Sequence, residues 1–142
     1  MQRVQTAQVV VDGDVVGQVG PGLMVLVAAH QNDTAESAAK MADRVWGLRI
    51  FNDQDGKMNI AIKEREKPEV LAISNFTLYG DATKGRRPSF VEAASFEQGK
   101  LLFDAFVLEL KKLGCSVSTG IFGADMKVSL INDGPVTLIL DS

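Results

Sequence analysis

The side chains that most often drive catalysis are scarce in this sequence. His30 is the only histidine and Cys115 the only cysteine among its 142 residues. His30 follows an apolar run and has no Cys, Ser or Asp motif beside it, so we expect a helix-entry or surface role rather than a general base. One histidine and one cysteine cannot supply a zinc site rich in nitrogen and sulfur ligands, and no carboxylate cluster has the spacing of metal ligands. We therefore expect no histidine triad, no metal and no cofactor.

A hydroxyl is the remaining candidate nucleophile. Thr77 lies in the stretch Ser74-Asn75-Phe76-Thr77-Leu78, directly after the apolar run 70–73. A hydroxyl at the end of a strand can attack an ester only if an adjacent base activates it. The sequence shows no such base, so we expect Thr77 to be a hydrogen-bonding residue, with covalent catalysis as the less favoured alternative.

A second stretch, Asn132-Asp133-Gly134-Pro135-Val136-Thr137, has unusual backbone chemistry. Gly134 can adopt backbone angles closed to other residues, while Pro135 fixes its own φ and offers no N–H. The pair predicts a rigid corner with exposed carbonyl groups. On local grounds this corner is a hairpin turn between strands 128–131 and 136–140, and a main-chain surface that recognises shape is the alternative.

Together the two stretches resemble the signatures of one enzyme family, the D-aminoacyl-tRNA deacylases. Asn132–Thr137 is similar to their NxGPVT motif, and Ser74–Leu78 is similar to their SQxTL motif, with Asn75 in place of glutamine. The likeness extends through residues 48–51, 56–59, 84–90 and 123–126, and so covers nearly the whole chain. Family members usually carry a few more residues before Gln2, so we expect a short first strand or a true start further upstream.

The resemblance implies hydrolysis of an ester at the terminal ribose of a tRNA that carries a D-amino acid or glycine. The main-chain N–H groups of Phe76 and Thr77 would stabilise the charge that develops on the substrate carbonyl. Ser74 and Asn75 would lie against the substrate. Because the ribose carries a neighbouring 2′-hydroxyl, the RNA would supply the group that the protein lacks, and positioning would accelerate hydrolysis.

The resemblance also implies how the two enantiomers are told apart. The family places a Gly-cis-Pro corner in the pocket of the partner subunit of a homodimer, where the carbonyls of Gly134 and Pro135 would collide with an L side chain. A cis X-Pro bond occurs in only about 5–6% of cases, so this assignment rests on the resemblance. Arg3 is expected to brace the corner and Met126 to line the pocket, each with an ordinary structural role as the alternative.

Two other functions stay open. An editing deacylase that removes a wrong L-amino acid would need space from a trans Gly-Pro bond, and a non-catalytic module that binds the tRNA end would fit the missing base. Lys84, Arg86 and Arg87 are candidate contacts to tRNA phosphates, with a solvated loop as the alternative. The net charge of −3 argues against indiscriminate nucleic-acid binding, and we expect no DNA partner.

Composition places the chain among ordinary globular proteins, since 46% of its residues are hydrophobic and 23% are charged. No apolar run approaches the ~20 residues of a membrane span, and no basic segment followed by an apolar one resembles a leader. The single Cys115 cannot form an internal disulfide. We expect a cytoplasmic protein without a membrane partner, folded as one domain over residues 1–142.

These candidate residues need a scaffold of many strands and two helices. Asp12-Gly13 predicts an opening hairpin. Asp33 with Glu36, and Ser95 with Gln98, resemble capping boxes for helices over 34–48 and 95–114. The expected strands cover 2–11, 14–19, 23–29, 50–51, 58–62 and 70–76, with further ones at 117, 121–122, 128–131 and 136–140.

The order of these elements predicts only an α+β fold. The resemblance implies more, namely a compact α/β fold in which the strands curl into a barrel-like sheet with the two helices packed outside, assembled as a homodimer.

Overall fold

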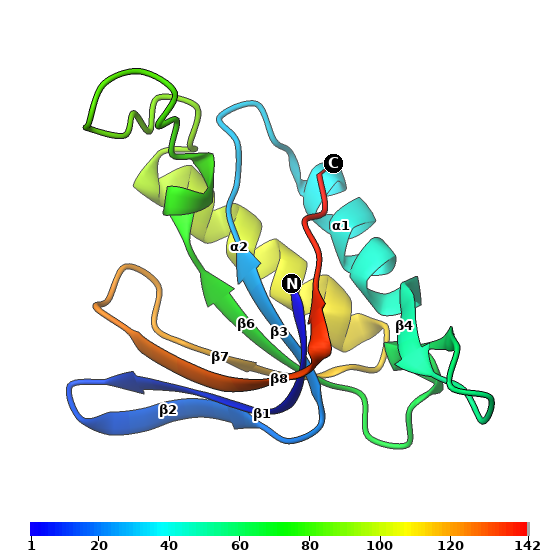
Figure 1. Cartoon of the computed structure of the whole chain (residues 1–142). Coiled ribbons are helices and arrows are strands. Elements are labelled where there is room, and N and C mark those ends of the chain that lie inside the picture. The colour runs from blue at the N-terminus through cyan, green and yellow to red at the C-terminus, as the bar shows by residue number, and fades with distance from the viewer. Residues whose placement is uncertain (142) are drawn as a thin grey trace.

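The computed structural model describes residues 1–141 and has a mixed α/β fold with a nearly closed, barrel-like sheet and two helices (Figure 1). Its strands are β1 (Gln2–Val11), β2 (Asp14–Val19), β3 (Gly22–Val27), β4 (Arg49–Asn52), β5 (Met58–Ala61), β6 (Glu69–Ser74), β7 (Ser116–Thr119) and β8 (Lys127–Thr137). Its α-helices are α1 (Ala35–Gly47) and α2 (Phe96–Lys112), and two short 3-10 turns cover Ile62–Glu64 and Phe76–Tyr79.

The main sheet has the order β2-β1-β3-β6-β7, and β8 pairs with β1. The pairs β3–β6 and β6–β7 are parallel, whereas β1 is antiparallel to β2, β3 and β8. Parallel neighbours require a crossover, and α1 and α2 lie within the two crossovers. The carboxyl ends of β3 and β6 therefore meet at one edge of the sheet, where Val27 is opposite Ser74.

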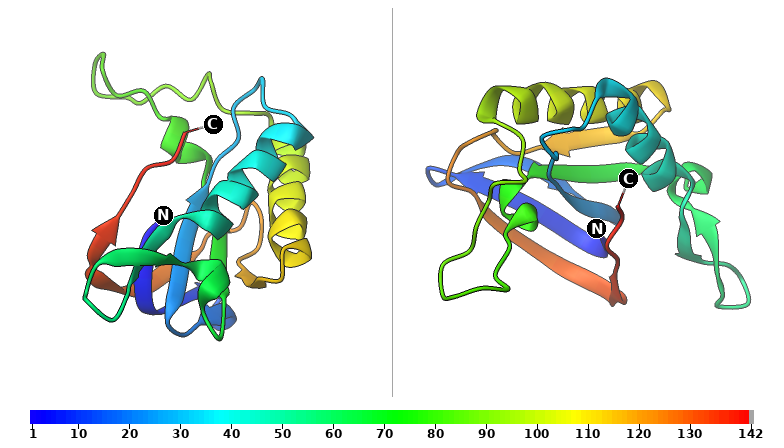
Figure 2. Two further views of the ribbon diagram at one scale, coloured as in Figure 1. Left: turned by 90° about the vertical axis from the view of Figure 1, so that its right-hand side faces the viewer. Right: turned by 90° about the horizontal axis from the view of Figure 1, so that it is seen from above.

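The apolar run predicted as a central strand over 23–29 forms β3 as far as Val27, and its residues 23–25 are buried on both faces. Leu23 and Val25 of β3 pack with the helices, together with Val70 and Ala72 of β6. The alternate residues face the inside of the barrel, where Met24 lies in a second core cluster of buried side chains from β1, β2, β3 and β6. Figure 2 shows both helices covering the same side of the sheet. Burial on both faces explains why the sequences of β3 and β6 are continuously apolar rather than alternating.

Both helices form where the sequence predicts them, but one cap differs. The N-cap of α1 is Thr34, which forms a reciprocal capping box with Ser37. The predicted pairing of Asp33 with Glu36 is wrong, because the Asp33 carboxylate instead accepts a hydrogen bond from the backbone N–H of His30 at 2.7 Å. Ser95 caps α2 as expected, accepting from the backbone N–H of Gln98 at 3.3 Å, but the predicted capping box is incomplete, because Nε2 of Gln98 donates to the carbonyl oxygens of Gln31 and Asp33.

The largest difference from prediction lies in the last strand. Lys127–Thr137 is a single strand rather than a hairpin, and residues 138–140 and 121–122 are outside any strand. Its register with β1 shifts between the pairs Val4↔Asn132 and Gln2↔Thr137. Two steps along β1 thus correspond to five along β8, so the Gly134-Pro135 corner is a large bulge in one strand.

The first strand covers Gln2–Val11, as predicted. The strand predicted over 70–76 ends at Ser74. Among residues 1–141, no helix is both long and apolar enough to cross a membrane.

Candidate active site

A cavity of about 760 Å³ opens at the edge where β3 and β6 end. Its walls come from five parts of the chain: the ends of β3 and β6 with the turn after β6, the start of α1, the start of α2 with the loop before it, the segment before β8 with Val128, and Leu140 with Asp141. Crevices at the carboxyl ends of parallel strands are common ligand sites, because the chain diverges there into separate loops. This position makes the cavity the candidate active site.

Ser74, Asn75 and Phe76 all line this cavity. Asn75 follows the last residue of β6, and its N–H donates to the carbonyl oxygen of Val27 at 2.7 Å. The chain then tightens into the 3-10 turn Phe76–Tyr79, where the N–H of Leu78 donates to the Asn75 carbonyl oxygen at 3.3 Å. The first N–H groups of such a turn have no partner within it. Within the described part of the chain, the N–H groups of Phe76 and Thr77 accordingly show no hydrogen-bond acceptor.

The hydroxyl of Thr77 is hydrogen-bonded to an amide oxygen, whereas a nucleophilic hydroxyl needs a base as its partner. Thr77 Oγ1 donates to the side-chain amide oxygen of Asn75 at 2.6 Å, and Thr77 is not among the residues that line the cavity. An amide oxygen is far too weak a base to take the hydroxyl proton. The geometry therefore favours a hydrogen-bonding role for Thr77 over covalent catalysis.

Aromatic side chains form much of the cavity wall. The rings of Phe76 and Phe90 meet edge to face at 5.1 Å, and Phe96 meets Phe122 in the same way at 5.1 Å. Phe76 remains 58% exposed, so it borders the mouth of the cavity rather than its floor. Phe90, Phe96 and Phe122 were not predicted as site residues, because they come from loops and a helix start that only the fold brings together.

Met126, which the resemblance assigns to the substrate pocket, is among the residues that line this cavity. Its sulfur lies so close to Gly120 that a Cβ built at Gly120 would be 2.4 Å away. A side chain at position 120 would therefore force Met126 to move.

Tyr79 also lines the cavity and was not predicted as a site residue. Partial burial raises the pKa of its phenol, and the nearby carboxylates of Asp33, Asp141 and Glu92 raise it further. The ring of His30 lies 5.5 Å from that of Tyr79, although His30 does not line the cavity. His30 thus supports the turn after β6 from outside.

The Gly134-Pro135 corner is absent from the lining of this cavity. Both residues are exposed, and the peptide bond between them is cis. Gly134 has a φ of +141°, and a Cβ added there would lie 2.9 Å from the backbone nitrogen of Val136. Only glycine fits this position without displacing the main chain.

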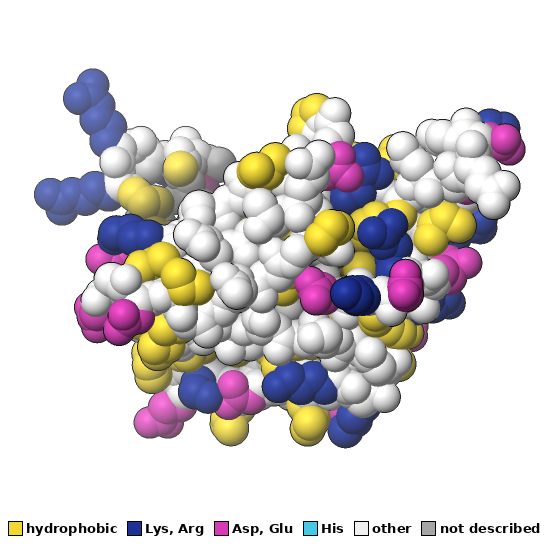
Figure 3. Space-filling model, turned by 90° about the horizontal axis from the view of Figure 1, so that it is seen from below, with side chains coloured by type: hydrophobic (Ala, Val, Ile, Leu, Met, Phe, Trp, Pro, Cys, Tyr) yellow, Lys and Arg dark blue, Asp and Glu magenta, His cyan; other side chains and the backbone are white. Residues whose placement is uncertain are grey.

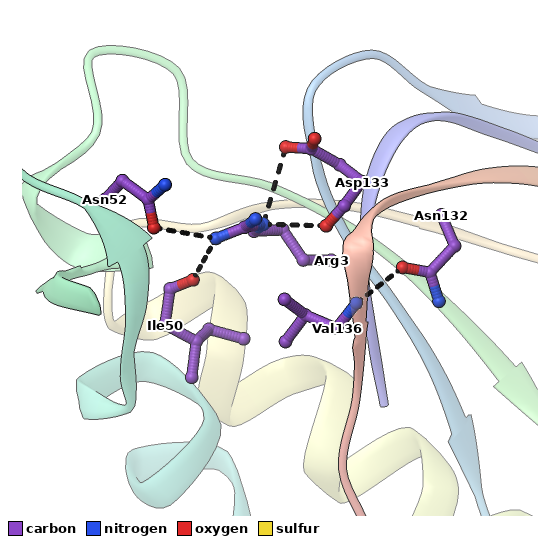
Figure 4. A network of polar contacts seen from close by, with 6 residues as sticks. All are labelled: Arg3, Ile50, Asn52, Asn132, Asp133 and Val136. Atoms are coloured by element: carbon purple, nitrogen blue, oxygen red, sulfur yellow. Dashed lines mark hydrogen bonds and ion pairs between the residues drawn. The ribbon is translucent and has the colours of Figure 1, made fainter. Parts of the chain in front are cut away.

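Arg3 lies between the corner and β4 and contacts both (Figure 4). Its side chain is buried, with 7% of the residue exposed, and its Nε donates to the carbonyl oxygen of Asp133 at 3.0 Å. Nη1 of Arg3 donates to the carbonyl oxygen of Ile50 at 2.7 Å and to Oδ1 of Asn52 at 3.3 Å. The corner is therefore connected to β4 through one guanidinium group.

A second brace comes from the corner itself. Oδ1 of Asn132 accepts from the N–H of Val136 at 2.8 Å, and Nδ2 of Asn132 donates to Oγ1 of Thr137 at 2.9 Å. The side chain of Asn132 thus closes the bulge from its two ends, which explains the asparagine at the start of the motif.

Lys84, Arg86 and Arg87 lie on an exposed loop that is closed by mutual backbone hydrogen bonds of 2.8 Å between Asp81 and Ser89. None of the three lines the cavity. Figure 3 shows Lys and Arg side chains extending from one corner of the molecule. Lys84, Arg86 and Arg87 are thus exposed and lie outside the cavity.

Comparison with known proteins agrees with this architecture. The family model described as D-Tyr-tRNA(Tyr) deacylase matches residues 1–141. Proteins named D-aminoacyl-tRNA deacylase from Geobacter sulfurreducens and from Thermotoga petrophila are each 51% identical over 142 residues, which covers 100% of this chain and 93% and 95% of the relatives.

Two solved structures share the fold. One is named c-Myc DNA Unwinding Element Binding Protein; it has a TM-score of 0.90 and 35% identity, and the match covers 99% of this chain and 95% of the other. The second, described as a probable eukaryotic D-amino acid tRNA deacylase, has a TM-score of 0.80 with 18% identity and coverage of 94% and 92%. The match over the whole chain and the 51% identity mean that this protein belongs to the D-Tyr-tRNA(Tyr) deacylase family of hydrolases.

Proposed function

We propose that this protein hydrolyses the ester that links a D-amino acid to the terminal ribose of tRNA. The observation that carries the proposal is that two successive main-chain N–H groups without an acceptor, those of Phe76 and Thr77, directly follow Ser74 and Asn75 of the cavity wall, while no base within residues 1–141 contacts the Thr77 hydroxyl. Such a site suits a reaction driven by placing and stabilising charge rather than by covalent catalysis. Membership in a family of aminoacyl-tRNA deacylases supports the same reaction.

The chemical step is the addition of water to the ester carbonyl carbon. The carbonyl oxygen becomes an oxyanion and accepts hydrogen bonds from the N–H groups of Phe76 and Thr77. The intermediate collapses by breaking the bond to the ribose oxygen, which takes up a proton, and free amino acid and tRNA leave. The adjacent 2′-hydroxyl of the RNA positions the water, so that no strong protein base is required.

Selection against L-amino acids is assigned to the main chain of the Gly134-Pro135 corner. The corner is exposed and does not reach the cavity of its own chain. We assign it to the cavity of a second copy in a homodimer, where its carbonyls face the α-carbon of the substrate. An L side chain would meet these carbonyls, a D side chain points away, and glycine passes because it has none, which makes glycyl-tRNA a second substrate.

The rest of the tRNA is assigned to the exposed loop that carries Lys84, Arg86 and Arg87. Their charges match phosphates, while the net charge of −3 limits binding elsewhere on the surface. Ser74, Asn75 and Met126 contact the aminoacyl end, and Arg3 supports the corner. We infer that a protein with this substrate acts in the cytoplasm.

The test measures release of amino acid from D-tyrosyl-tRNA, L-tyrosyl-tRNA and glycyl-tRNA by the purified protein. We expect hydrolysis of the D-tyrosyl and glycyl esters and none of the L-tyrosyl ester at the same enzyme concentration. Preferential hydrolysis of the L-tyrosyl ester would instead indicate an editing deacylase for L-amino acids. Binding of the tRNA end without hydrolysis of any ester would indicate a binding module.

A parallel measurement addresses assembly. Light scattering across a dilution series, combined with activity at each concentration, is expected to show a dimer that loses activity as it dissociates. A monomer with full activity would contradict the cross-subunit site.

A further inference from the structure

We infer that Thr77 is a positioning residue that orients the side-chain amide of Asn75, so that the amide nitrogen of Asn75 donates a hydrogen bond to an oxygen of the bound aminoacyl ester or its ribose. This inference rests on the proposed function and assigns a donor within its site.

The orientation follows from the contact between the two side chains. Thr77 Oγ1 and Asn75 Oδ1 are 2.6 Å apart. An amide oxygen can only accept a hydrogen bond, so the hydroxyl must be the donor. The contact fixes which end of the amide faces Thr77, and the nitrogen Nδ2 must point the other way.

The backbone of Asn75 is held as firmly as its side chain. Its N–H donates to Val27 at 2.7 Å, and its carbonyl oxygen accepts from the N–H of Leu78 at 3.3 Å. With both backbone groups and Oδ1 occupied, Nδ2 is the remaining polar group of the residue. Within residues 1–141 no acceptor bonds to this nitrogen.

The free nitrogen belongs to a residue that lines the cavity, whereas the hydroxyl that orients it belongs to a residue that does not. The pair therefore presents a donor to the ligand and keeps the acceptor out of reach. A ligand group that matches it must be an oxygen acceptor. In an aminoacyl ester these are the ester carbonyl and the ribose oxygens.

The same arrangement gives Thr77 a role that requires no reaction at its hydroxyl. If the hydroxyl only orients Asn75, its removal has no further effect once the Asn75 amide is gone. If the hydroxyl reacts or contacts the substrate directly, its removal has the same effect with or without that amide. A double-mutant cycle separates the two cases.

The cycle uses Thr77→Val, Asn75→Ala and the double variant, with two readouts. One is kcat/KM for D-tyrosyl-tRNA, and the other is Kd for an adenosine that carries D-tyrosine through a 3′-amide, which cannot be hydrolysed as an ester. We expect each single variant to have a kcat/KM about fivefold lower and a Kd about fivefold higher than wild type, as for the loss of one neutral hydrogen bond. The double variant should have the same kcat/KM and Kd as Asn75→Ala. Thr77→Ser should restore the wild-type values, because serine keeps the hydroxyl.

The inference is overturned if Thr77→Val weakens binding of the analogue, or lowers kcat/KM, by the same factor in the presence and in the absence of the Asn75 amide. It is also overturned if Thr77→Val has no effect at all. Thr6→Val is the matched control, since the Thr6 hydroxyl donates to the Val19 carbonyl away from the cavity, and it should match wild type. Circular dichroism checks that each variant is folded.

The analogue also identifies the acceptor and separates this inference from the proposed function. The effect of Asn75→Ala on Kd is then measured again with a 2′-deoxy analogue. If the effect disappears, the acceptor is the ribose 2′-hydroxyl. If the effect persists, the acceptor is the carbonyl or one of the remaining ribose oxygens. Because the binding cycle needs no turnover, wild-type protein that fails to hydrolyse any ester would overturn the proposed function while the cycle still decides on Thr77.

Discussion

Nε of Arg3 donates to the main-chain carbonyl oxygen of Asp133 at 3.0 Å, joining the second residue of β1 to the bulge in β8. The two positions are 130 residues apart in sequence. The carboxylate of Asp133 adds an ion pair at 3.4 Å, with the Asp133 side chain 46% exposed. A corner built from glycine and proline has few side chains of its own, so its position depends on such contacts from neighbouring strands.

Replacing Arg3 with lysine should therefore loosen the corner. Lysine lacks the planar fork that reaches Asp133, Ile50 and Asn52 together, so at least one buried carbonyl loses its partner. We expect Arg3→Lys to lower the free energy of unfolding by about 2 kcal/mol in urea denaturation. Arg44 is exposed, so Arg44→Lys should change the free energy of unfolding by less than about 0.5 kcal/mol. If both substitutions changed it equally, Arg3 would not support the corner as described.

Gly134→Ala should damage the corner more directly. The new Cβ would lie 2.8 Å from Val136 Cγ2 and 2.9 Å from the Val136 nitrogen, in a backbone conformation that alanine rarely adopts. Because the proposed function makes this corner a wall of the partner's cavity, we expect hydrolysis of D-tyrosyl-tRNA to fall by about tenfold or more. Gly47→Ala, where nothing lies within 4 Å of the added Cβ, should retain activity.

Phe76→Pro tests the main-chain donor at the start of the 3-10 turn. Proline removes the N–H but suits the first position of a helical turn. We expect a loss of about 10²-fold or more in kcat, as for an oxyanion-hole donor. Phe76→Ala removes only the ring and keeps the N–H, so it should lose far less. Similar losses in both variants would mean that the ring, and not the donor, matters.

The loop with Lys84, Arg86 and Arg87 should affect tRNA and not the aminoacyl end. We expect the triple alanine variant to bind tRNA more weakly. The slope of log K for tRNA against log salt concentration should become shallower by up to about three, one for each charge removed. Hydrolysis of the small substrate D-tyrosyl-adenosine should be unchanged. The variant with Lys100, Lys111 and Lys112 replaced on α2 is the charge-matched control, and an equal effect there would indicate nonspecific attraction.

Local pattern predicted most of the scaffold because most of it is specified locally. The turn at Asp12-Gly13, the doubly buried run of β3 and the cap at Ser95 each follow from a few adjacent residues. The N-cap of α1 was predicted one residue too early, because it depends on a contact outside the capping pattern. Asp33 has the right chemistry for a cap, but its carboxylate is engaged by the His30 N–H, and the next residue takes over.

The errors in the candidate site have a common physical origin. Gly134-Pro135 has the local chemistry of a turn, yet pairing with β1 on both sides keeps it within a strand. That pairing joins residues far apart in sequence and leaves no local signal. The same holds for the aromatic wall and for Tyr79, which meet the Ser74–Phe76 segment only through the tertiary fold.

The cross-subunit corner is tested most directly by mixing two defective variants. Gly134→Ala has an intact cavity and a defective corner, whereas Phe76→Pro has the reverse. If each cavity is completed by the partner's corner, a mixed dimer contains one site without either defect. Unfolding and refolding the two together should restore about a quarter of the wild-type rate on D-tyrosyl-tRNA, since half the dimers are mixed and each has one good site of two. A mixture no more active than the separate variants would contradict the account.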